Sequence, residues 1–175
     1  MRAGRTQGQR VLGLGYPTPY LGLFREDSER CLAFMPTAQG VLKWPTARPA
    51  LATLVDEFSL PLPDAAVDRV LLVHALEMSD DPEGLLREVW RVLAPSGRVM
   101  AVIPNRRGVW TRTDTTPFGH GRPYSRSQIT QLLRQTWFTP TASACSGSAI
   151  RRPISACSGK IPSAASRSCR RRRAC

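Results

Sequence analysis

The chain lacks the features of a secreted or membrane-spanning protein. No apolar stretch among its 175 residues approaches the ~20 needed to cross a bilayer. The stretch that follows the basic segment 1–10 is broken by Gly13, Gly15, Pro17 and Pro19, which is unlike a secretory signal. We therefore expect a cytoplasmic protein without a membrane partner.

The chain also lacks the closely paired cysteines of common zinc sites. Cys145, Cys157, Cys169 and Cys175 lie near the C-terminus at spacings of twelve, twelve and six, and Cys31 stands apart. Common zinc motifs do not have these spacings. Without a secretory signal, disulfide bonds are not expected either. We expect reduced thiols and no metal site.

Residues 139–175 lack acidic side chains and nearly lack large aliphatic ones. They hold eight of the 25 basic residues and none of the 13 acidic ones, so the first 138 residues carry only about +4 of the net charge of +12. Such a segment buries too little apolar area to offset an ordering entropy of roughly 1–2 kcal/mol per residue. We therefore expect a folded domain over residues 1–138 and a disordered, basic, Ser/Cys/Arg-rich tail over 139–175.

The tail contains a short repeat, because Ser143–Gly147 recurs as Ser155–Gly159. Together with the abrupt change in composition, this repeat leads to the hypothesis that the tail is coded out of frame, which resequencing the locus would test. The run Arg170–Arg173 could contact RNA phosphates. A solvated tail is the simpler interpretation, so we expect no nucleic-acid partner except through this tail.

Buried strands alternate with helices in the rest of the chain. The clearest strand is Val67–His74, a nearly continuous apolar run that is typical of a central parallel strand buried on both faces. This alternation predicts an α/β fold with a mostly parallel, twisted sheet. The other expected strands are 10–15, 30–35, 50–55 and 98–103, with a short extended piece at 40–44.

Two helices have clear N-terminal signals. Asp81 is an expected N-cap, followed by Pro82 at the first helical position. Ser125 and Gln128 form an expected capping box. A weaker helix is expected over 18–27. The apolar residues that predict the buried face of the helix after Asp81 are Leu85, Leu86, Val89, Trp90 and Leu93.

In this order and spacing, the residues resemble the class I S-adenosylmethionine-dependent methyltransferases, and specifically the type 11-like group, over about residues 10–138. The motifs that carry the resemblance are Asp56–Asp68, His74, Asp81–Pro82, Leu86, Glu88, Arg91–Gly97 and Tyr124–Ser125. The resemblance implies a Rossmann-like sheet with flanking helices, and S-adenosyl-L-methionine as the cofactor. It implies methyl transfer to an acceptor that the sequence does not identify, a small molecule being one candidate.

The resemblance also implies where the cofactor binds. Its contacts would come from Gly13, Gly15 and Tyr16 at the first strand-to-helix turn, from Asp56 and Glu57 at the adenine position, and from His74. No catalytic residue is implied, because holding the nucleophile in line with an already activated methyl group supplies much of the catalysis. His74 itself is more typical of a structural histidine than of a catalytic one. His120 and Tyr124 lie in the loop where an acceptor would enter.

The first turn departs from the family pattern. Pro17 and Pro19 replace its second and third glycines, Gly13 replaces an acid, and Phe34–Pro36 stands where an acid usually follows the second strand. Proline removes an N–H donor. These departures leave a second hypothesis open, a catalytically inactive methyltransferase-like domain that binds a protein or RNA. A nicotinamide enzyme is disfavoured because no acid is available for its ribose.

Two elements that family members usually have are not expected. Only residues 1–9 precede the first strand, where one or two helices usually occur. The C-terminal strand hairpin beside the fifth strand also has no counterpart in the sequence pattern. We therefore expect a bare sheet edge at 99–103, which would be an aggregation hazard.

Overall fold

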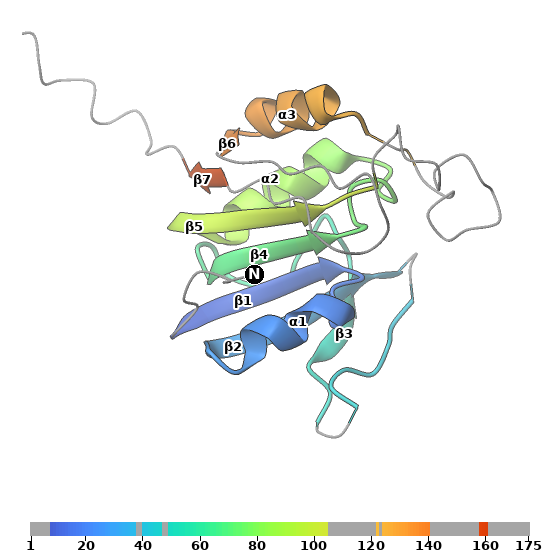
Figure 1. The fold of residues 1–175 in the computed structure, drawn as a ribbon, viewed down its shortest axis with the longest axis vertical. Helices are drawn as coiled ribbons and strands as arrows, with labels where there is room; N and C mark the ends of the chain where they lie inside the picture. Colours follow the sequence, from blue (N-terminus) through green and yellow to red (C-terminus); the bar gives the residue numbers. More distant parts are fainter. Residues whose placement is uncertain are drawn as a thin grey trace, which may run out of the picture.

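The computed structural model describes residues 8–37, 40–46, 49–104, 122, 124–140 and 158–160. For residues 158–160 it describes the backbone only. They form one seven-stranded sheet in the order β3-β2-β1-β4-β5-β7-β6 (Figure 1). The strands are β1 (Gln9–Gly15), β2 (Ser28–Pro36), β3 (Ala52–Val55), β4 (Val67–Val73), β5 (Leu93–Val102), β6 (Phe138–Pro140) and β7 (Ser158–Lys160). Strands β1 to β5 pair in parallel, which confirms the predicted α/β fold.

Three helices accompany the sheet: α1 (Thr18–Arg25), α2 (Pro82–Val92) and α3 (Arg126–Gln135). The predicted caps are present, since Asp81 accepts a hydrogen bond from the Gly84 amide and Ser125 forms a full capping box. None of the helices in the described part of the chain is long and apolar enough to cross a membrane.

The two faces of the sheet bury different side chains. In β4, Val70 and Leu72 belong to a core with α2 and α3, whereas Leu71 and Val73 belong to a second core with α1. This alternation follows from the period of two along a strand. It explains the continuous apolar run of β4, and Figure 1 shows α1 and α2 on opposite faces of the sheet.

Strand β5 begins earlier than the sequence pattern predicts. Helix α2 ends at Val92, and Leu93 already has extended backbone angles. Leu93 is therefore a strand residue and not the last residue of the helix. The register of β5 against β4 shifts between Val67 and Arg69, which accommodates the Pro95–Gly97 segment inside the strand.

The sheet does not stop at β5. Strand β7 pairs antiparallel with β5, at Arg98 and Val99, and β6 pairs antiparallel with β7. These two strands of three residues each lie beside β5. The missing family hairpin and the division into a domain over 1–138 and a tail over 139–175 remain predictions. Residues 141–157 and 161–175 lie outside the described residues, so the disordered tail remains a prediction there. The extended piece expected at 40–44 is not a strand.

Candidate functional site

The direction in which the sheet grows reverses between β1 and β4. From β1 the sheet extends through β2 to β3, and from β4 it extends to β5, so this pair is the topological switch point. Ligands of open α/β sheets bind in the crevice at the carboxyl ends of the strands at such a point. Gly15 and Val73 are register partners at the carboxyl ends of these two strands. The carboxyl ends of β1 and β4 are therefore the expected place for a ligand site.

Gly15 has a backbone that only glycine can use. Its φ is +94°, and a Cβ added there would lie 2.2 Å from the carbonyl oxygen of Val73. The next residue is tied to the same oxygen, because the Tyr16 amide donates to it at 2.8 Å. Glycine at this position therefore allows the β1 turn to lie directly against the end of β4.

The space beside the rest of the turn between β1 and α1 is occupied by the protein's own side chains. A Cβ on Gly13 would lie 2.5 Å from the Cβ of Pro17, so the proline ring occupies the space that Gly13 leaves. The amides of Tyr20 and Leu21 both donate to the Pro17 carbonyl, and Pro19 has no N–H. The start of α1 therefore offers a ligand few backbone donors, which is the physical consequence of the two prolines.

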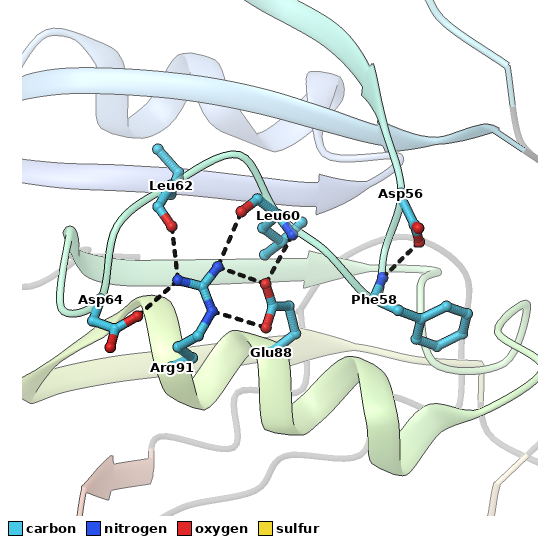
Figure 2. A network of polar contacts seen from close by, with 7 residues as sticks. All are labelled: Asp56, Phe58, Leu60, Leu62, Asp64, Glu88 and Arg91. Atoms are coloured by element: carbon cyan, nitrogen blue, oxygen red, sulfur yellow. Dashed lines mark hydrogen bonds and ion pairs between the residues drawn. The ribbon is translucent and has the colours of Figure 1, made fainter.

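Asp56 and Glu57 follow β3 and face different partners. Asp56 is exposed, and its Oδ1 accepts the Phe58 amide at 2.9 Å (Figure 2). Glu57 Oε1 accepts the hydroxyl of the buried Ser79 at 2.6 Å. Because Ser79 belongs to the loop after β4, this bond joins the loops that follow β3 and β4.

Arg91 fixes the segment that carries these acids. Figure 2 shows its guanidinium between α2 and the loop after β3, with donors to Glu88, Asp64 and two carbonyls. The distances are 2.6 Å to Glu88 Oε1, 2.8 Å to Asp64 Oδ1, 2.8 Å to the Leu62 carbonyl and 3.0 Å to the Leu60 carbonyl. Glu88 Oε1 also accepts the Leu60 amide. Arg91 lowers the pKa of Glu88, which keeps this carboxylate charged.

His74 follows β4 directly and has an unusual backbone conformation. Its φ is +52°, which is uncommon for a residue with a side chain, and such strain clusters at functional sites. Its Nδ1 lies 2.6 Å from Oε1 of Glu77. Glu77 is only 4% exposed, and within the described part of the chain its Oε2 has no hydrogen-bond partner. The two side chains form the His74–Glu77 pair.

The segment before α3 closes this side of the site. The Arg122 amide donates to the Glu77 carbonyl at 2.8 Å. Burial raises the pKa of the half-buried Tyr124; the positive charge of Arg122 lowers it and the negative charge of Glu77 raises it. Tyr124 and Arg122 therefore lie close enough to the His74–Glu77 pair to share its electrostatics.

Three of the six predicted contact residues meet at the switch point, namely Gly15, Tyr16 and His74. Gly13 lies in the same turn but packs against α1. Asp56 and Glu57 follow β3, beyond β2, and Glu57 reaches the loop after β4 through Ser79. His120 lies outside the described residues. In those residues, no three His, Cys, Asp or Glu side chains gather as a metal site requires.

The sequence analysis missed Glu77 and Ser79. Both are polar residues buried in the loop after β4. The spacing of three between His74 and Glu77 could have indicated a paired site, but one apolar neighbour on each side of Glu77 hides it in the sequence. It also missed an exposed apolar rim, the Tyr16, Phe58 and Met78 side chains, which follow β1, β3 and β4 and are 44–46% exposed.

Comparison with known proteins identifies the family. A model described as a methyltransferase domain matches residues 13–101, which is half of the chain. The chain belongs to this family. The match contains the Gly15 turn, the acids after β3 and the His74–Glu77 pair.

Individual methyltransferases give the same result. A "Probable S-adenosylmethionine-dependent methyltransferase" of Mycobacterium tuberculosis is 39% identical over 85 residues, which are 47% of this chain and 31% of that protein. The chain thus spans about a third of the length of the curated relatives that it matches.

Solved structures show the fold. The Burkholderia thailandensis 1,6-didemethyltoxoflavin-N1-methyltransferase superposes with a TM-score of 0.64 at 16% identity, covering 89% of this chain and 72% of that one. A methyltransferase from Archaeoglobus fulgidus superposes with a TM-score of 0.63 at 19% identity, covering 77% and 63%. The Rossmann-like methyltransferase fold expected from the sequence is therefore confirmed.

Proposed function

We propose that this chain is a methyltransferase that binds S-adenosyl-L-methionine at the switch point between β1 and β4. One observation supports this best: the family match spans the strands and loops that meet there, including the Gly15 turn. The polar groups of those loops suit a cationic nucleoside, since Asp56 and Glu57 carry carboxylates.

The residues present fit this cofactor at the loop after β3, where the exposed Asp56 and the partly buried Glu57 carry two carboxylates. When bound, the cofactor supplies a methyl group already activated by its sulfonium. Gly15 and Tyr16 would border it, and Asp56 and Glu57 would accept hydrogen bonds from the adenine or the ribose.

The chain's departures from the family pattern predict weaker binding of the cofactor. Phe34, Met35 and Pro36 are buried at the end of β2, where the family's ribose-binding acid usually stands. The amide of Tyr16 is already used inside the protein. We expect binding to depend mainly on side chains from the loops after β3 and β4, and to be weaker than in a member with the full turn.

The second candidate is a catalytically inactive domain that binds a protein or RNA. The prolines favour it, because Pro17 fills the space beside Gly13 and Pro19 removes a donor from the start of α1. We place the protein in the cytoplasm under either function. Under the first function, we propose a small molecule as the methyl acceptor.

Calorimetric titration of the full chain with S-adenosylhomocysteine separates the two candidates. The methyltransferase proposal predicts saturable binding. The Asp56→Asn variant keeps the hydrogen bond to the Phe58 amide but loses the charge, and it should bind more weakly by ~1–3 kcal/mol. Glu83→Gln, on the exposed side of α2, is the matched control and should bind as the unmodified chain does. No heat from the folded, unmodified chain would favour the inactive domain.

A further inference from the structure

The loop after β4 contains a carboxylate oxygen that the fold leaves unsatisfied. Glu77 is 4% exposed, and its Oε2 is buried without a hydrogen-bond partner among the residues that the structure describes. Burying an unpaired ionised oxygen costs several kcal/mol in general, and buried polar atoms in native proteins are nearly always paired. The rest of Glu77 is well held, since Oε1 meets His74 and its carbonyl accepts the Arg122 amide. A ligand donor is the simplest partner for Oε2.

The position of Glu77 indicates which ligand this is. Glu77 follows β4 by only a few residues, and the end of β4 lies against the Gly15 turn. Glu57, in the loop after β3, accepts a hydrogen bond from Ser79, which lies two residues after Glu77. Within the proposed function, the cofactor lies along the Gly15 turn, and we infer that the methyl acceptor lies beyond the end of β4, beside Glu77.

The charges around Glu77 define the chemistry of the acceptor. Among the described residues, the groups near Glu77 are His74 on the same loop and Arg122 and Tyr124 before α3. A buried carboxylate repels anionic acceptors such as carboxylates and thiolates, and it stabilises a group that bears N–H donors and gains positive charge. An amine has both properties, because its nitrogen becomes an ammonium as it takes the methyl group.

We propose that Oε2 of Glu77 binds the N–H of an amine and that primary or secondary amines are the methyl acceptors of this site. This proposal rests on the proposed function. The neutral amine nitrogen attacks the methyl carbon with its lone pair; the carbon–nitrogen bond forms, the carbon–sulfur bond breaks, and the sulfur keeps the electron pair. The product nitrogen carries one positive charge beside Glu77, and its extra proton goes to water after release.

His74 acts through Glu77. Its contact with Oε1 fixes the carboxylate orientation, and its backbone at this point has a positive φ. His74 is therefore a positioning residue. His74→Asn keeps a donor at this position and tolerates the positive φ, so it should retain more activity than His74→Ala.

The test uses the full chain, tritiated S-adenosylmethionine and four separate pools of small amines, alcohols, thiols and carboxylic acids. We expect label in the amine pool only. Glu77→Gln keeps the shape but loses the charge, and it should lower kcat on the responding amine on the order of 10²-fold. Its affinity for S-adenosylhomocysteine should be unchanged. Glu83→Gln is the matched control and should have full activity.

The outcomes are distinct. If S-adenosylhomocysteine binds but label enters another pool or none, or if Glu77→Gln transfers to the amine at the full rate, the amine proposal is overturned while the proposed function survives. If S-adenosylhomocysteine does not bind, the proposed function itself fails. Should Glu77→Gln not fold, Glu77→Asp keeps the charge but retracts it; a kcat lowered with unchanged cofactor affinity supports the proposal, and an unchanged kcat contradicts it.

Discussion

At Gly15 a single missing Cβ lets two strands approach each other. The carbonyl of Val73 occupies the position that a side chain would need, and the φ of +94° is unfavourable for other residues. Gly22, in the middle of α1, has the opposite environment, because a Cβ there would meet nothing within 4 Å. The two glycines therefore form a matched pair for mutation.

Gly15→Ala should destabilise the fold by at least ~2 kcal/mol, since it combines a backbone clash with a strained φ. Gly22→Ala should stabilise it by ~0.5–1 kcal/mol, which is the difference in helix propensity. Urea denaturation followed by circular dichroism measures both changes. Equal effects of the two substitutions would show that Gly15 is not constrained as described.

Cys31 should be an unreactive thiol in the native state. It is buried in the α1-side core, and burial raises its pKa to about 11. Few molecules then carry the thiolate at neutral pH. Iodoacetamide labelling, read from the Cys31 peptide by mass spectrometry, should be slow in buffer and fast in urea. Rapid labelling of the native chain at pH 7 would contradict the buried position.

The same pKa has a consequence for stability at high pH. The pKa of Cys31 is higher in the folded state than its ordinary value of 9.0. Its contribution to the free energy of unfolding is therefore fully present below pH 9 and is lost as the pH rises toward 11. Cys31→Ala should remove this part of the alkaline loss of stability. An alkaline profile identical to that of the unmodified chain would exclude it.

At the scale of elements, Arg91 joins α2 to the loop after β3. Its guanidinium donates to Glu88, to Asp64 and to the carbonyls of Leu60 and Leu62. Surface pairs contribute little by comparison. On the same helix, Arg87 pairs with Glu83 alone among the residues described, and both side chains are largely exposed. The comparison isolates the contribution of the network.

Arg91→Ala should cost ~2–3 kcal/mol, because it removes the charged partner of Glu88 and leaves two carbonyls without their donor. Arg87→Ala, the control, should cost less than ~0.5 kcal/mol. Chemical denaturation gives both values. If the two substitutions have the same effect, the network does not hold the loop that carries Asp56 and Glu57.

The elements could be predicted well where one physical signal dominates. Both helix caps and the continuous apolar run of β4 were read correctly, because each depends on local sequence. The start of β5 was placed too late, since Pro95 and Gly97 suggest a loop but lie inside the strand beside a register shift. Strands β6 and β7 were missed because three-residue strands leave no periodic pattern.

The candidate site was predictable only in part. Glycine turns and acids after strands are visible in the sequence, so Gly15, Asp56 and Glu57 could be named. The burial of Glu77 and its contact with His74 depend on how the loop after β4 folds against the segment before α3. Packing of that kind joins residues distant in sequence, and one sequence does not reveal it.

At the scale of the whole molecule, two carboxylates make the free energy of unfolding depend on pH in the acidic range. Hydrogen bonds from Arg10 lower the pKa of Asp68, and those from Arg91 lower the pKa of Glu88. A carboxylate whose pKa is lowered in the folded state stabilises the fold at pH values above its ordinary pKa. This stabilisation is lost as the pH falls from the ordinary pKa through the lowered one. The ordinary values are 3.8 and 4.5, so this loss should begin below about pH 5.

Urea midpoints measured from pH 7 to pH 3 test this dependence. The midpoint should fall below pH 5. In Glu88→Gln, a variant that is less stable at pH 7, the fall should be smaller, because one of the two titrating groups is gone. A midpoint independent of pH over this range would show that neither carboxylate depends on its arginine.

The central claim is that a sulfonium nucleoside binds where β1 and β4 end. Amide chemical shifts of the ¹⁵N-labelled full chain, titrated with S-adenosylhomocysteine, test it most directly. We predict that the shifted amides cluster at the carboxyl edge of the sheet, at Gly15, Tyr16, Glu57 and His74. Shifts confined to the opposite edge, around Gln9 and Arg98, or no shifts at saturating ligand, would contradict the claim.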